Sequence, residues 1–204
     1  MPDTVDLPLI LAFDTSVAHC AAVLIRGDAV LVNRVEVMAR GQAEHLMPML
    51  EQMLATAGVT WGDLAAIGVG TGPGNFTGIR IGVAAARGLA LALGIPAVGV
   101  SGFDVAAPEA DQPFWAVIEA PRDMVYVQRR AAQMATPRLI PAAEVAQLDA
   151  PLARLADIPA SEMVRRIAET ARSSYRSALA RPTPVYVRPA DALPSSEPPL
   201  VILP

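Results

Sequence analysis

An apolar run, a glycine-rich loop and a helical pattern follow one another directly over residues 65–93. The run AAIGVG has the uninterrupted hydrophobicity of a strand whose two faces are both buried. Four glycines lie within residues 70–78, and the helix expected over 79–93 has Thr77 as its candidate cap and Gly94 as its stop. A buried strand that leads into a helix in this way is typical of a layered α/β fold.

The segments on either side of this unit complete an ordered set of elements. Hydrophobic patterns predict strands over 9–14, 20–27 and 29–37, which form an antiparallel meander. An apolar stripe predicts a helix over 43–57, and a further short strand follows at 97–101. Three strands, helix, strand, helix, strand is the ribonuclease-H-like order that each lobe of the actin and sugar-kinase superfamily uses.

Composition changes near the middle of the chain, which indicates a domain boundary. All 14 glycines lie at or before Gly102, whereas 14 of the 19 prolines lie beyond it. We expect an N-terminal lobe over 1–107, a smaller C-terminal lobe over 108–190 and an irregular tail over 191–204. The second lobe is predicted to repeat the layout in abbreviated form, with strands over 114–120, 124–130, 138–141 and 184–188 and helices over 142–148 and 161–179.

Composition excludes several classes of function. All 16 cationic residues are arginines, so the chain has no lysine for a P-loop or a Schiff base. The net charge of −4 lacks the basic excess of a protein that holds nucleic acid by phosphate neutralisation alone. The single Cys20 allows no intrachain disulfide and is expected in the core. His19 and His45 have no histidine or cysteine at metal-ligand spacing, so no metal site is expected.

The distribution of charge favours a cytoplasmic protein. Asp3 and Asp6 precede the first apolar run, which is unlike a secretory signal peptide. The longest apolar stretch, 79–100, contains Arg80 and Arg87 and is rich in alanine and glycine, so no membrane span is expected. We therefore expect a cytoplasmic location and no membrane partner.

Two short motifs are candidates for chemistry. Asp14, Thr15 and Ser16 end the first strand, where a carboxylate can hold a metal ion or the Mg²⁺ of a nucleotide, or where all three side chains can simply hydrogen-bond a turn. The glycine-rich loop, a helix N-terminus and Arg80 could form a phosphate cradle, or the glycines could serve only a tight turn. The candidate cleft residues of the loop are Gly72, Pro73, Gly74, Asn75, Phe76, Thr77 and Arg80.

Known chemistries of this architecture are poorly supported. An autonomous ATPase needs glycine-rich phosphate turns in both lobes, but the Asp14 turn has no glycine and the second lobe has none at all. A metal nuclease needs several converging acids, and few are available. No serine, cysteine or metal constellation supports proteolysis.

Two helices carry surfaces that need an explanation. The helix over 79–93 is lined with small residues, which permits close approach of the chain's own sheet or of another helix. Together with the amphipathic helix over 43–57 it could form a docking face. Four arginines on the C-terminal helix, interrupted by two glutamates, are a solvated face or an RNA contact: Arg165, Arg166, Arg172 and Arg176.

The quoted residues resemble a known family. FDTS near the N-terminus, LMPML in the first helix and the block IGVGTGPGNFTGIRIGVAAARGLALALGIPAVGVS look like the TsaB (YeaZ) family over residues 9–103. Weaker agreement continues through EAPRDMVY at 119–126 and PVYVR at 184–188. The family belongs to the biosynthesis of threonylcarbamoyladenosine in tRNA.

The resemblance implies a two-lobed, noncatalytic scaffold. Its paralogue TsaD transfers the threonylcarbamoyl group to the adenosine beside the anticodon, TsaB pairs with TsaD through the first-lobe helices, and the ATPase TsaE joins the pair. We therefore expect contact with tRNA only through the complex, a homodimer when the chain is alone, and no intrinsic cofactor, with ATP or ADP at the interface of the complex left open. The interface residues implied for this chain are Leu46, Leu50, Met53, Gly82, Ala85, Ala86 and Leu89.

One segment separates this chain from the paralogue. TsaD carries a metal-binding NHxxxH segment after its fifth strand, whereas Gly102 and Ala106 stand at the two histidine positions here. Two other sites depart from the TsaB pattern, because Gln42 replaces a frequent histidine and the second-lobe DAR becomes EAPR at 119–122. The alternative to a scaffold is an autonomous ATPase or kinase of the actin-like fold.

Overall fold

A computed structural model describes residues 7–108, 112–177 and 180–187. The N-terminal half forms a five-stranded sheet of order β3-β2-β1-β4-β5, in which β1, β2 and β3 are antiparallel and β4 and β5 run parallel to β1. This is the predicted ribonuclease-H-like topology. The strands are β1 (Leu9–Asp14), β2 (His19–Arg26), β3 (Ala29–Val37), β4 (Ala66–Gly70) and β5 (Ala97–Val100).

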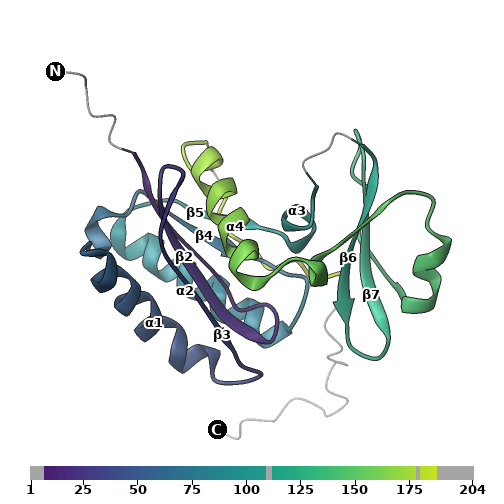
Figure 1. The fold of residues 1–204 in the computed structure, drawn as a ribbon, viewed down its shortest axis with the longest axis horizontal. Coiled ribbons are helices and arrows are strands. Elements are labelled where there is room, and N and C mark those ends of the chain that lie inside the picture. Colours follow the sequence, from purple (N-terminus) through teal and green to yellow (C-terminus); the bar gives the residue numbers. More distant parts are fainter. Residues whose placement is uncertain (1–6, 109–111, 178–179, 188–204) are drawn as a thin grey trace, which may run out of the picture.

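Helices cover both faces of this sheet, so its central strands are buried throughout (Figure 1). Helices α1 (Gln42–Ala57) and α2 (Phe76–Leu93) pack on one face, and α4 (Ala160–Ser174) packs on the other. Side chains alternate along each strand. In β1, Leu9, Leu11 and Phe13 face α1 and α2, whereas Ile10 and Ala12 face α4.

The second lobe is the abbreviated repeat that the sequence predicts. Its sheet has the order β8-β7-β6-β9, with an antiparallel meander and one parallel strand. The described residues of this lobe contain no fifth strand. Its elements are β6 (Phe114–Ala120), β7 (Met124–Arg130), β8 (Arg138–Pro141), the 3-10 helix η2 (Ala142–Gln147), β9 (Leu152–Arg154) and the 3-10 helix η3 (Leu155–Asp157). Short helices η1 (Trp61–Asp63) and α3 (Gly102–Val105) complete the set.

The C-terminal helix belongs to the first sheet by packing, although it lies within 108–190 in sequence. Its buried residues Val164, Ile167 and Ala171 share one core with β1, β2, β4 and β5, and with Ala116 and Ile118 of β6. The chain thus crosses to the second lobe and returns, and the two lobes share a core.

Several expected elements differ in detail. Asn75 caps α2 through a hydrogen bond from Gly78 N to its Oδ1, so Thr77 is not the cap. The segment expected as a helix over 142–148 is 3-10, and α4 ends at Ser174, before the expected 179. Residues 184–187 form no strand, although Val185 N donates to Thr71 O. The tail expected over 191–204 lies outside the described residues.

Candidate functional site

Asp14 is the centre of a buried polar cluster at the end of β1. Its Oδ1 accepts hydrogen bonds from the backbone N and the hydroxyl of Ser16, at 2.9 and 3.0 Å, and lies 2.9 Å from His19 Nε2. Asp14, Ser16 and His19 are each at most 5% exposed. The carboxylate is therefore occupied with closing the β1–β2 turn, which is the structural role that the sequence left open.

The glycine-rich loop packs directly on this turn. Thr15 Oγ1 donates a 2.7 Å hydrogen bond to Gly78 O, and Asn75 N donates to Ser16 O at 2.6 Å. A Cβ on Gly78 would collide with the carbonyl oxygen of Thr15, and one on Gly74 with that of Ser16. The glycines are needed because two stretches of backbone touch here.

This contact leaves no room for a phosphate between the loop and the turn. Two of the backbone donors at the start of α2 are already used, because Gly78 N donates to Asn75 Oδ1 and Ile79 N donates to Asn75 O. Asp14 Oδ2 fills the space beside Gly70, where a Cβ would collide with it. The space between the loop and the Asp14 turn is thus filled by the protein's own atoms.

A hollow of about 330 Å³ lies beside His19, between the β1–β2 turn, the end of β6 and the start of α4. Most of its lining is apolar, with His19 and Glu119 as the titratable groups and no arginine. An apolar wall offers a phosphate no hydrogen-bond donor, and the carboxylate of Glu119 carries charge of the same sign as a phosphate. The local sequence held no signal for this hollow, because its lining comes from three distant segments.

Arg80 points away from the Asp14 cluster. Its guanidinium carbon lies 3.7 Å from the centroid of the Phe76 ring, and its Nε donates to Tyr186 Oη at 2.9 Å. The structure therefore separates Arg80 and the exposed Phe76 from the cleft residues with which the sequence grouped them. Tyr186 is a contact that sequence analysis missed, since it lies 106 positions from Arg80.

Most of the expected interface residues are core residues. The side chains of Leu46, Leu50, Met53 and Ala86 are at most 1% exposed and pack under the sheet. Gly82 faces Thr15, whose Oγ1 would lie 2.8 Å from a Cβ at residue 82. These five positions are corrected from interface to core. The apolar stripe of each helix predicted a buried face, but it did not show whether the chain's own sheet or a second protein covers that face.

Ala85 and Leu89 remain half-buried at the surface. They lie on the α1 side of α2 with Ile81, and all three pack at the edge of the core that α1 covers. Met47 of α1 is also half-buried against that core. We call Met47, Ile81, Ala85 and Leu89 the α1/α2 ridge.

Helix α2 has the length and mean hydropathy, 1.4, of a membrane-spanning helix. One of its sides packs on the sheet, and a core helix of a soluble protein meets the same criteria. Leu91 near its end is 81% exposed.

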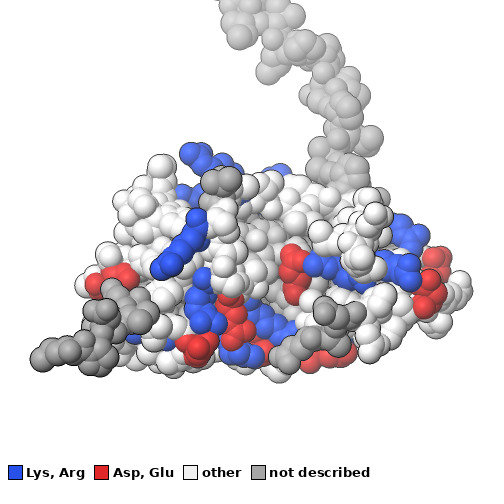
Figure 2. All heavy atoms as spheres, turned by 90° about the horizontal axis from the view of Figure 1, so that it is seen from above, with Lys and Arg blue, Asp and Glu red and all other residues white. Residues whose placement is uncertain are grey.

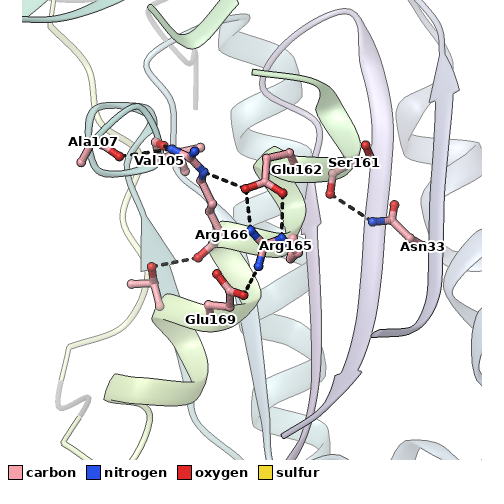
Figure 3. A network of polar contacts seen from close by, with 9 residues as sticks. Asn33, Val105, Ala107, Ser161, Glu162, Arg165, Arg166 and Glu169 are labelled. Carbon is pink, nitrogen blue, oxygen red and sulfur yellow. Dashed lines mark hydrogen bonds and ion pairs between the residues drawn. The ribbon is translucent and has the colours of Figure 1, made fainter. Parts of the chain in front are cut away.

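The arginines of α4 are held by the chain itself. Glu162 accepts from Arg165 and Arg166, and these hydrogen bonds, with that from Arg165 dominant, hold the pKa of the Glu162 carboxyl below its ordinary value (Figure 3). Arg166 Nη1 also donates to the carbonyls of Val105 and Ala107 at 2.9 and 3.2 Å. Figure 2 shows arginine and acidic side chains next to one another over the face seen there, without a single broad basic patch.

The segment that would hold a metal in the paralogue packs as a structural turn. Gly102 N donates to Gly72 O at 2.8 Å, and a Cβ on Gly102 would lie 2.8 Å from Ile118 Cδ1. Ser101 and Asp104 form a capping box for α3. Among the described residues, no three histidine, cysteine or acidic side chains lie close enough together to hold a metal ion.

Comparison with known proteins gives one family. The family model described as "TsaD: tRNA N6-adenosine threonylcarbamoyltransferase" matches residues 35–189. The tRNA threonylcarbamoyladenosine biosynthesis protein TsaB of Escherichia coli (strain K12) is 39% identical over 92 residues, which cover 45% of this chain and 39% of that protein. An uncharacterised protein of Mycobacterium tuberculosis (strain ATCC 25618 / H37Rv) is 40% identical over 127 residues, which cover 61% of this chain and 60% of that protein.

Solved structures agree over a longer span. YeaZ from Pseudomonas aeruginosa is 25% identical, with a TM-score of 0.67, and the match covers 88% of this chain and 100% of that one. A second Pseudomonas aeruginosa structure, described as similar to peptidase YEAZ, is 26% identical with a TM-score of 0.69. The match to the curated relatives, by contrast, spans about 60% of their length or less.

Proposed function

Because this chain belongs to the TsaB (YeaZ) family, within the group that the TsaD family model describes, we propose that it is a noncatalytic subunit in the biosynthesis of threonylcarbamoyladenosine in tRNA. The relatives named for this pathway support the assignment of the process, and the geometry of the first lobe supports the noncatalytic role that we propose. As a member of this pathway the chain would work in the cytoplasm.

The contact of the glycine-rich loop with the Asp14 turn carries the noncatalytic part of the proposal. In this architecture chemistry on a nucleotide requires bare backbone that can approach phosphates. Here Gly74 and Gly78 lie against the carbonyls of Ser16 and Thr15, so the motif stabilises the lobe. Gly102 and Ala106 supply no imidazole for a metal.

The α1/α2 ridge is the surface that we assign to the partner, a TsaD protein. Half-buried Met47, Ala85 and Leu89 present an apolar surface of small and flexible side chains, which allows helices of a second protein to approach closely. TsaE would then join the pair. In the absence of TsaD the same ridge could pair two copies of this chain, which light scattering would detect as a dimer.

Binding of a nucleotide would depend on residues of the partner protein. Because the glycine-rich loop packs against the Asp14 turn, we expect ATP or ADP at the interface of the complex to be held by groups of TsaD. The alternative function, an autonomous ATPase or kinase, predicts stoichiometric binding and turnover of ATP by the isolated chain. We expect neither, and calorimetry with ATP and Mg²⁺ would decide.

Reconstitution tests the proposed function directly. The cognate TsaD, TsaE, the synthase that forms the threonylcarbamoyl adenylate, tRNA, ATP, threonine and bicarbonate would be combined with and without this chain. We expect modified tRNA only in its presence, together with a complex that copurifies with TsaD. Equal modification without the chain, and no complex, would refute the proposal.

A further inference from the structure

A groove runs along the side of α2 that faces away from α1. It consists of two adjoining hollows of about 400 and 420 Å³, both lined by Arg87. One hollow extends toward Arg80 and Tyr186, and the other toward Leu91 and Arg181. Helix α2 forms one wall, and the described residues 180–187 contribute to the other.

Positive charge gathers in this groove. Arg80, Arg87 and Arg181 are exposed, and none of them forms an ion pair with any residue that the structure describes. Residues 64–103 contain no aspartate or glutamate, and neither do 170–187. By contrast, Arg165, Arg166 and Arg172 on α4 are all paired. Among the residues that the structure describes, these three arginines line the groove without acidic partners, although the net charge of the chain is −4.

Aromatic rings stand at one end of the groove. Phe76 is 42% exposed and Tyr186 is 44% exposed, although both are large rings with ample apolar surface. Their centroids lie 5.1 Å apart, and Arg80 packs on Phe76 while its Nε bonds to Tyr186 Oη. This arrangement holds both rings in place and leaves the terminal nitrogens of Arg80 available.

We propose that this groove binds a single-stranded segment of RNA, with phosphates on Arg80, Arg87 and Arg181 and a base stacked on the exposed rings. Single strands are held by cationic grooves that follow the backbone and by aromatic platforms for the bases. Arg80 and Arg87 are seven positions apart on a helix, so they lie on the same side about 10 Å from each other. Because a single strand is flexible, it can bring two of its phosphates to this separation.

RNA fits this surface better than an acidic peptide does. An acidic peptide would use the arginines but has no need of two exposed rings beside them. The groove also lies on the other side of α2 from the α1/α2 ridge, so a strand and a protein partner can bind together. This differs from the expectation that tRNA is contacted only through the complex, and it does not depend on the proposed function.

Binding of the isolated chain to a fluorescein-labelled twelve-nucleotide oligouridine, followed by fluorescence anisotropy, tests the proposal. With three phosphate contacts, the logarithm of the association constant should fall with the logarithm of the salt concentration, with a slope of about −2. Arg87→Gln should reduce the slope by about 0.7, and loss of a stacked base in Tyr186→Leu should weaken binding roughly 5- to 150-fold. The matched control is Arg34→Gln, which removes an arginine of β3 at the far edge of the sheet and should leave both quantities unchanged.

Three results would overturn the proposal. One is no binding of the oligouridine at low salt, and another is an equal effect of Arg34→Gln and Arg87→Gln. The third is competition by polyglutamate as strong as by unlabelled oligouridine with no effect of Tyr186→Leu, which would assign the groove to an acidic protein. Failure here leaves the reconstitution result untouched, because that experiment tests the protein partner.

Discussion

The hydroxyl of Thr15 donates a 2.7 Å hydrogen bond to the carbonyl oxygen of Gly78, 63 positions further along the chain. The same two residues touch through their backbones, because Thr15 O occupies the space that a side chain on residue 78 would need. This pair seals the start of α2 to the end of β1. The glycine-rich segment that the sequence offered as a phosphate cradle therefore joins two stretches of backbone here. We call the contact between Thr15 and Gly78 the clasp.

A methyl group at residue 78 should break the clasp. We expect Gly78→Ala to lower the free energy of unfolding by about 3 kcal/mol or more, because the new Cβ collides with backbone that cannot move as a side chain can. Urea unfolding followed by circular dichroism would measure the change.

Gly88→Ala is the matched control for that variant. It lies in the same helix, but a Cβ at residue 88 meets no atom within 4 Å. Replacing a helical glycine by alanine should stabilise the protein by about 0.5–1 kcal/mol. Equal destabilisation by both variants would contradict the clasp.

A bulky residue on the α1/α2 ridge should abolish binding to TsaD without unfolding the chain. Ala85 is half-buried at the surface, so Ala85→Trp should weaken the complex by roughly 100-fold or more through a steric clash across a close helix contact. Calorimetric titration of TsaD measures this loss. The control is Ser173→Trp, at an exposed position of α4 on the opposite face of the sheet, and this variant should bind TsaD as the wild type does. If Ala85→Trp also binds TsaD with unchanged affinity, the α1/α2 ridge is not the docking surface.

The Cys20 thiol should make stability depend on pH in the alkaline range. Burial, followed by the charges of Glu36 and Asp14, raises the pKa of Cys20 from 9.0 to about 12. The contribution of the protonated Cys20 thiol to the free energy of unfolding is fully present below pH 9. It is lost as pH rises toward 12, because the thiol loses its proton at a lower pH in the unfolded chain than in the folded one. The stability difference between the wild type and Cys20→Ala should change between pH 9 and 12 by up to about 1.4 kcal/mol per pH unit. A constant difference in urea unfolding over that range would contradict the burial argument.

Arg166 should stabilise the packing of α4 against the segment in which the chain passes from the first lobe to the second. It joins Glu162 of α4 to the carbonyls of Val105 and Ala107, where the chain leaves the first lobe (Figure 3). Arg166→Ala should lower the free energy of unfolding by about 1–2 kcal/mol, because two carbonyls lose a charged donor. Arg176→Ala is the control, since Arg176 hydrogen-bonds only to the neighbouring Tyr175 among the described residues and should cost about 0–0.5 kcal/mol. Thermal unfolding compares the two variants.

Local pattern was sufficient to predict most of the fold. Alternating and fully apolar runs placed β1 to β5 within about one residue, because a buried strand must be continuously hydrophobic. The helix stop expected at Gly94 was also correct, since this glycine adopts the left-handed conformation that ends a helix. The resemblance to TsaD, and not local pattern, identified Gly102 and Ala106 as the positions where that paralogue has its two histidines.

The functional surfaces depended on contacts between distant segments. An amphipathic stripe shows that Leu46, Leu50 and Met53 are buried, but only the packed sheet shows that the chain itself buries them. Likewise, nothing near Arg80 in sequence indicates Tyr186, and nothing near residue 160 indicates that α4 returns to the first sheet. Periodicity reports which face of an element avoids water, whereas the identity of its neighbour is decided by the lowest free energy of the whole packed chain.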